Sequence, residues 1–151
     1  DRLFTQFHQT HSRGNYPIRC VRNHRFGYIF NPWSNGKREF RNESQSGRTM
    51  AAMQAAAEDD PATAERVRFF LHRVPEEFYD FSEDPDARHN RIDDPAFKEE
   101  IETLRAELLR WMEETEDPAL DAFRNRESPE ARESFVRWME DNLGTNRTKE
   151  S

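Results

Sequence analysis

The segment Pro75-Glu-Glu-Phe-Tyr-Asp-Phe-Ser-Glu-Asp-Pro-Asp-Ala-Arg-His-Asn90 decides the fold of this chain. Phe78, Tyr79 and Phe81 have high strand propensity, and the run from Ser82 to Pro85 is typical of a turn. The segment therefore predicts one short strand that ends in a tight corner. Strands joined by loops are expected before it and helices after it, so this strand closes a sheet. A purely structural role accounts for the segment, because aromatic strands mostly belong to a core.

Length and composition are typical of one folded domain. The chain has 151 residues, of which 34% are hydrophobic and 35% charged, and the hydrophobic residues are clustered. The single cysteine, Cys20, excludes an internal disulfide and a cysteine-based zinc site. No apolar run approaches 18 residues and no signal-peptide pattern is present, so no membrane partner is expected. We expect one α+β domain over residues 1–144 and a polar tail over residues 145–151. Because the chain begins at Asp1 rather than at a methionine, we expect a piece of a longer protein.

The net charge of −7 is unevenly distributed. Residues 1–48 contain nine Lys/Arg and three Asp/Glu, whereas residues 49–151 contain 14 and 27. The basic part indicates either an anionic partner on that side or arginines that flank exposed strand positions. Nucleic acid is not an expected partner, because the remainder is strongly acidic and no nucleic-acid-binding motif is present.

Alternating residues predict three strands before the deciding segment. They lie at Leu3–Phe7, Tyr16–Arg22 and Arg25–Phe30, and Asn23-His24 forms a two-residue turn between the last two. In the third strand, Phe26, Tyr28 and Phe30 share one face and Ile29 lies on the other. The stretch from Trp33 to Thr49 is rich in Ser, Asn, Gly and Arg and is interpreted as a long surface loop.

Apolar residues at helical spacing predict the remaining elements. An alanine-rich helix covers 50–57, and a second begins at Asp60-Pro61 and stops at Pro75. Asp94-Pro95 starts a helix of about five turns, Asp117-Pro118 a short one, and Ser128-Pro129 a last one that stops at Gly144. The inward residues of the two longer helices are Phe97, Ile101, Leu104, Leu108, Trp111, Met112, Phe135, Trp138, Met139 and Leu143. The expected fold is α+β: a small antiparallel sheet of about four strands with helices packed on one face.

No catalytic residue can be assigned from motifs. The chain lacks Gly-x-Ser-x-Gly and any phosphate-binding glycine loop. Asp80, Asp84 and Asp86 are better explained by turn chemistry than by a metal site, so no metal ligand is assigned. His8 and His11 lie where the first strand ends, and they are either donors to an anion or ordinary surface or core histidines.

Five segments carry a recognisable pattern in order. They are Phe4–His8, Tyr16–Arg22, Arg25–Asn31, Glu77–Phe81 with Asp84-Pro85 and Asn90, and Trp111–Pro118. In this order they resemble the carboxy-terminal subdomain of the sulfatase family, and in particular its sulfamidase branch. That subdomain has paired strands of the Tyr-Pro-x-Arg-x-Val-Arg and Arg-Tyr-x-Tyr-Ile-x-Asn types, then an Asp-Pro turn followed by Asn, then a helix that ends near a tryptophan.

The resemblance implies a parent hydrolase that uses formylglycine and calcium in a larger amino-terminal domain. Formylglycine arises from Cys/Ser-x-Pro-x-Arg in that family, and this chain has no such motif. Cys20 is followed by Val21-Arg22-Asn23, and the proline of Ser128-Pro129-Glu130-Ala131-Arg132 comes one place too early. The chain alone is therefore not expected to hydrolyse sulfate, and no cofactor is assigned to it.

The resemblance also implies partners. The expected ones are the catalytic domain and a sulfated amino sugar, which His8, His11 and Arg19 would contact by charge-assisted hydrogen bonds. A subdomain without its catalytic domain would expose an apolar face and self-associate. The alternative is a stand-alone, non-catalytic module that binds a sulfated polysaccharide through the basic part of the chain. The parent is expected in the periplasm, outside the cell or in the lysosome.

Overall fold

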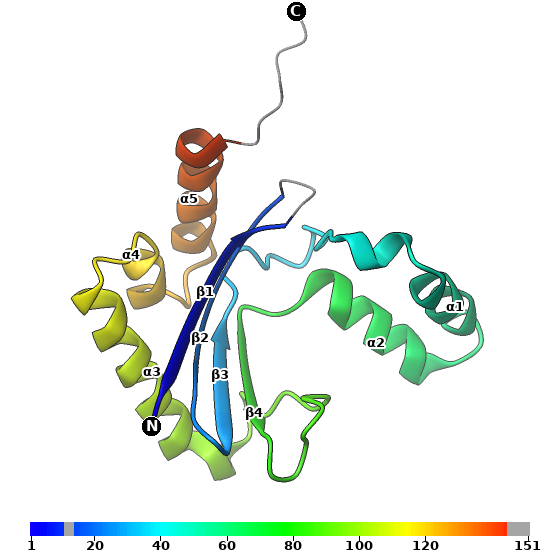
Figure 1. Cartoon of the computed structure of the whole chain (residues 1–151), viewed down its shortest axis with the longest axis horizontal. Coiled ribbons are helices and arrows are strands. Elements are labelled where there is room, and N and C mark those ends of the chain that lie inside the picture. Colours follow the sequence, from blue (N-terminus) through cyan, green and yellow to red (C-terminus); the bar gives the residue numbers. More distant parts are fainter. Residues whose placement is uncertain (11–13, 145–151) are drawn as a thin grey trace, which may run out of the picture.

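The computed structural model describes residues 1–10 and 14–144, and it shows an α+β fold (Figure 1). Four antiparallel strands form one sheet in the order β1-β2-β3-β4. The strands are β1 (Leu3–Gln9), β2 (Asn15–Arg22), β3 (Phe26–Phe30) and β4 (Glu76–Asp80). The helices are α1 (Arg48–Ala56), α2 (Pro61–His72), α3 (Lys98–Glu114), α4 (Leu120–Arg124) and α5 (Pro129–Met139), with short helical turns at η1 (Glu43–Ser46), η2 (Pro95–Phe97) and η3 (Glu140–Gly144). The predicted fold class is confirmed.

Strand β4, the strand of the deciding segment, forms one edge of the sheet. Its outer side is covered by the chain that returns after the corner. The Asn90 side chain accepts from the Phe78 N–H at 2.8 Å and donates to the Glu76 carbonyl at 3.2 Å, while the Arg91 N–H donates to the Phe78 carbonyl. Asp80 holds the corner itself, because its carboxylate accepts from the Ser82 backbone N–H and hydroxyl. An edge strand with its polar groups occupied in this way is protected from pairing with another chain.

The β2–β3 turn lies one residue later than the sequence pattern predicted. The Asn23 N–H donates to the Phe26 carbonyl, so the two turn residues are His24 and Arg25. The Asn23 carboxamide oxygen accepts from the N–H groups of both Arg25 and Phe26 at 2.8 and 2.7 Å. This side-chain turn explains the difference, because Asn stabilises a turn from the position that precedes it.

The main core lies between the sheet and helices α3 to α5, which cover one face (Figure 1). Phe26, Tyr28 and Phe30 share the covered face, as predicted. The core is completed by these buried residues: Val21, Phe78, Ile101, Leu104, Leu108, Met112, Ala119, Ala122, Phe123, Phe135 and Met139. The predicted helical caps are also present, because Asp60, Asp94 and Ser128 each accept a hydrogen bond from the first turn of the following helix. The last helix continues directly from α5 into the π-helical turn η3, which ends at Gly144, the predicted stop.

Most of the stretch 33–49 lies at the surface, as its polar composition predicted, but its first residues, Trp33 and Ser34, are buried. Trp33 is completely buried, and its ring packs edge-on against Tyr16 at 5.2 Å and near Phe40 at 5.7 Å. These residues form a second, smaller apolar cluster with Val136. Ser34 ties the segment to the end of α2, because its hydroxyl donates to the His72 carbonyl. A single tryptophan outweighed the surrounding polar residues, since its burial removes a large apolar area from water.

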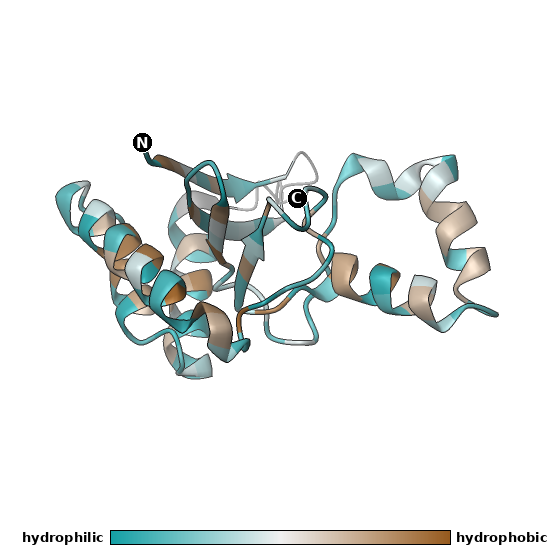
Figure 2. Ribbon diagram, turned by 90° about the horizontal axis from the view of Figure 1, so that it is seen from below, coloured by the Kyte–Doolittle hydropathy of each residue, from teal (hydrophilic) through white to brown (hydrophobic). Residues whose placement is uncertain are grey.

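Helices α1 and α2 pack mainly on each other and project from the sheet on the side away from α3 to α5 (Figures 1 and 2). Each buries one residue below a tenth exposure, Met50 in α1 and Val67 in α2. Helix α2 ends at His72 and not at Pro75 as predicted, because Arg73 adopts a positive φ of 52° that breaks the helix. Among the described residues, no helix has both the length and the apolar character needed to cross a bilayer.

Candidate functional site

The predicted sugar-binding residue Arg19 lies in the core. Its Nε donates to Asp117 Oδ2 at 2.6 Å and its Nη2 to Asp117 Oδ1 at 2.9 Å, while Nη1 donates to the Ile18 carbonyl at 3.0 Å. Arg19 is 0% exposed, so this bidentate pair is shielded from solvent. The pair joins β2 to the corner between α3 and α4, where Asp117 also accepts from the Ala119 N–H. A sugar contact by Arg19 stays a prediction, and in this structure the guanidinium binds Asp117.

His8 lies near the end of β1, at the register shift between Phe7 and Gln9, and Arg19 and Asp117 are its charged neighbours. Its Nε2 atom is buried and has no hydrogen-bond partner within the described part of the chain. Burial lowers the pKa of His8, the positive charge of Arg19 lowers it further, and Asp117 partly opposes both effects. The imidazole is therefore neutral at pH 7 and can either donate or accept a hydrogen bond at Nε2. His11, the other predicted histidine, lies outside the described residues.

Several arginines of the basic part form ion pairs with the acidic remainder. These pairs include Arg2–Glu107 at 2.5 Å, Arg19–Asp117 at 2.6 Å, Arg25–Asp80 at 2.8 Å, and those of Arg38 with Glu133 at 3.3 Å and Glu140 at 3.5 Å. Arg25 is the first cause of the lowered pKa of Asp80, which falls to about 2 because the guanidinium stabilises the carboxylate. Part of the positive charge of residues 1–48 is thus compensated by contacts with residues distant in sequence. Sequence counts missed this because they do not show which charges meet in space.

The second face of the sheet is open over β1, β2 and β3. The register places Leu3, Phe7, Ile18, Cys20 and Ile29 together on this face, opposite the core. Leu3 is 56% exposed and Phe7 40% exposed, while the other three are half-buried. We call these five residues the open sheet face. An exposed group of apolar side chains on one face is typical of an interaction surface.

The described residues hold no evident catalytic or metal-binding centre. Across residues 1–10 and 14–144, no group of three or more His, Cys, Asp or Glu side chains is arranged to hold a metal ion. Asp80 and Asp84 instead serve the corner after β4, where Asp84 accepts from the His89 N–H at 2.7 Å. Burial raises the pKa of the Cys20 thiol, so the reactive thiolate is disfavoured. The implied calcium and formylglycine do not fit these residues.

Comparison with curated proteins finds a match to human N-sulphoglucosamine sulphohydrolase, with 40% identity over 52 residues. The match covers 34% of this chain and 10% of the human protein, so the chain spans only a small part of that relative. No protein-family profile matches the chain. A partial similarity of this extent supports a relationship to the sulfatase family and no more.

Several residues of the sulfatase-like segments have structural roles that explain their types. Arg19 and Asp117, from two segments far apart in sequence, form the buried ion pair. Asn90 covers the edge of β4, and Asp80 binds Arg25 across the neighbouring strand end. The segments that resemble the family therefore come together in one interlocked unit. The sequence showed their order, but their pairing appears only in the structure.

Proposed function

We propose that this chain is the carboxy-terminal subdomain of a sulfatase-related hydrolase that acts on sulfated amino sugars. The observation that carries this proposal is the 40% identity over 52 residues to N-sulphoglucosamine sulphohydrolase. The subdomain closes one wall of the substrate pocket and does not catalyse hydrolysis by itself. Since none of the described residues fits formylglycine or calcium, no chemical step is assigned to this chain.

The open sheet face is the surface that meets the catalytic domain in this proposal. Two observations support this assignment. Leu3 and Phe7 are exposed on β1, and Phe7 pairs with half-buried Ile18 of β2. The match also covers only 10% of the curated relative, so a protein of that length has further chain to cover such a face. Burying these side chains would stabilise the contact, at roughly 25 cal/mol for each Å² of apolar surface removed from water.

We propose His8 as a residue that contacts the sugar. Its buried Nε2 lacks a partner in the described residues, and an unsatisfied polar group in a protein interior calls for one. A neutral imidazole at this place would donate to a sulfate or hydroxyl oxygen of the sugar. His11 remains a candidate by sequence position alone, and a contact by Arg19 would require the Asp117 pair to open.

The reading frame that encodes the chain gives the first test. Continuation upstream into Cys/Ser-x-Pro-x-Arg supports the proposal, whereas a start codon near Asp1 with no such motif overturns it. The encoded protein is then assayed for sulfate release from an N-sulfated glucosamine disaccharide. Replacing the Cys or Ser of the upstream motif by Ala must abolish release, and the 151-residue chain alone must show none.

The role of His8 has its own test in that full-length protein. His8→Ala should raise KM or lower kcat for the disaccharide, because a contact to the sugar is lost. His24→Ala is the matched control, since His24 is an exposed turn residue far along the β2–β3 hairpin. Kinetics of His8→Ala and His11→Ala that both equal those of the control would remove these residues from the proposal.

A further inference from the structure

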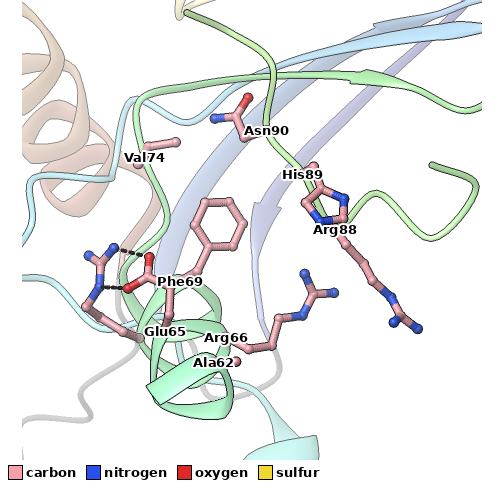
Figure 3. A pocket seen from close by; sticks show the side chains of 9 residues that line it. Ala62, Glu65, Arg66, Phe69, Val74, Arg88, His89 and Asn90 are labelled. Atoms are coloured by element: carbon pink, nitrogen blue, oxygen red, sulfur yellow. Dashed lines mark hydrogen bonds and ion pairs between the residues drawn. The ribbon is translucent and has the colours of Figure 1, made fainter. Parts of the chain in front are cut away.

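A cleft of about 730 Å³ lies between α2 and the segment that follows the corner after β4 (Figure 3). Such a volume is within the range of small-molecule sites. Helix α2 contributes Ala62, Glu65, Arg66, Arg68 and Phe69, and the returning chain contributes Arg88, His89 and Asn90, with Val74 between them. None of these residues belongs to the sites that the sequence predicted.

Two side chains give the cleft its chemical character: the aromatic ring of Phe69 and the guanidinium of Arg66. In Figure 3 the Phe69 ring projects into the middle of the cleft, and the Arg66 side chain extends toward the wall that carries His89. Among the described residues, no carboxylate forms an ion pair with Arg66. Its neighbour Arg68 pairs with Glu65, and Glu65 lies on the other side of the cleft from His89.

The other charged side chains that line the cleft have partners within the chain. Arg88 pairs with Asp86 at 2.9 Å, but both side chains are more than 60% exposed, and exposed ion pairs of this kind contribute little. Asp84 binds the His89 backbone at 2.7 Å and lies 3.5 Å from its imidazole. The charges of Arg68 and Arg88 are thus matched by Glu65 and Asp86, whereas that of Arg66 is not. A ligand anion bound at Arg66 would give the third arginine of the cleft an anionic partner as well.

The walls of the cleft are held in place by contacts that do not involve a ligand. Asn90 is fixed by its hydrogen bonds to β4, and the Arg73 guanidinium lies 5.2 Å from the centre of the Phe69 ring. Arg73 is fixed in turn by Glu77 at 3.4 Å. Preorganised walls reduce the conformational entropy that a ligand must overcome on binding.

We propose that this cleft binds a saccharide that carries a sulfate or a carboxylate group. The anion is held by Arg66, with Arg88 and His89 on the facing wall, and the sugar ring packs on Phe69. The choice of an anion follows from the cleft, whereas the choice of a saccharide as its carrier rests on the proposed function. The site is separate from His8 and Arg19 and lies next to the edge strand β4 on the α2 side.

Calorimetric titration of the 151-residue chain with a heparin-derived, N-sulfated disaccharide at physiological salt tests this site. Saturable binding is expected, and Arg66→Ala should weaken it about tenfold through the loss of a charge-assisted hydrogen bond. Arg110→Ala is the matched control, since Arg110 is an exposed arginine on α3 that pairs with Glu114 at 3.7 Å. It should change the dissociation constant less than twofold. Both residues are exposed, so neither change should affect folding.

Two results would overturn the proposal. The first is the absence of saturable binding, and the second is an equal effect of Arg66→Ala and Arg110→Ala, which would mean unspecific attraction to a polyanion. A matched disaccharide that is N-acetylated, lacks sulfate and keeps its uronic acid identifies the anion. Retained affinity assigns the carboxylate to Arg66, and lost affinity assigns the sulfate.

This test can be told apart from the test of the proposed function. If the chain does not bind through Arg66 but its reading frame continues into Cys/Ser-x-Pro-x-Arg, only the proposal for the cleft is overturned. If the chain binds through Arg66 but its reading frame lacks the upstream motif, the site for an anionic saccharide is supported and the sulfatase proposal is overturned.

Discussion

The body of the molecule, formed by β1 to β4 with α3 to α5, differs from the projecting α1–α2 pair in how its residues are used. Helix α3 buries Ile101, Leu104, Leu108 and Met112, whereas α1 buries only Met50 and α2 only Val67. The arginines differ in the same way, since Arg19 of the body is 0% exposed and ion-paired while Arg66 of α2 is exposed. Stability thus resides in the body, whereas the helix pair leaves the Arg66 guanidinium without an ion-pair partner among the described residues.

The largest effect that separates the two regions is expected at the buried ion pair. Arg19→Met should lower the free energy of unfolding by about 3–5 kcal/mol, because Asp117 would keep a buried charge without its partner. Urea denaturation measures the loss. The double variant Arg19→Met/Asp117→Asn should recover part of it, since no unpaired charge remains. A loss below about 1 kcal/mol in the single variant would show that the pair does not hold the body together.

A matched leucine pair gives the next effect. Leu108→Ala in α3 removes a completely buried side chain and should cost about 3 kcal/mol, whereas Leu71→Ala in α2 removes a half-buried one and should cost about 1 kcal/mol. The midpoints of urea unfolding of the two variants measure the difference. Equal losses would contradict the division into a packed body and a loosely packed helix pair.

Acid should destabilise the body through Asp80. Its pKa lies at about 2 in the folded chain, below the ordinary value of 3.8, chiefly because Arg25 stabilises the carboxylate. The stabilising contribution is therefore complete above about pH 5 and is lost as the pH falls toward 2. We expect a loss of about 1–2 kcal/mol, reduced by solvent around the half-exposed Arg25 side chain. Asp80→Asn is the control, because it removes the titrating group and should flatten this part of the pH profile.

The smallest effect is expected in α1. Ala55→Gly, at an exposed position, should cost at most about 1 kcal/mol of helix stability. Because α1 contacts mainly α2 and the adjacent turn η1, this loss should be local. Hydrogen exchange should quicken at the amides of α1 and α2 and remain unchanged in α3. Faster exchange throughout α3 would mean that the helix pair unfolds together with the body.

Much of the fold follows from local sequence signals. The Asp-Pro and Ser-Pro starts of helices, the alternation in β3 and the strand-and-corner of the deciding segment all correspond to observed elements. The errors are equally specific. The loop prediction for 33–49 missed buried Trp33, and the helix boundary at Pro75 missed the positive φ of Arg73. Both depend on contacts or backbone geometry that local composition does not encode.

The candidate sites were far less accessible to sequence reasoning. Arg19 was identified from its charge, but its partner Asp117 lies 98 positions later. Arg66 and His89 show no motif and come from two different segments. Their meeting at one cleft depends on how α2 and the returning chain pack around the edge of β4.

By itself, the sequence determined most element types, the shared face of Phe26, Tyr28 and Phe30 and the resemblance to sulfatases, because each depends on local residue patterns. Only the tertiary structure decided which arginines are neutralised, which sheet face the helices cover, and where the Arg66 guanidinium, without an ion-pair partner among the described residues, lies beside an aromatic ring. The physical reason is that Coulomb attraction and burial depend on distances in space, and residues far apart in sequence set those distances here.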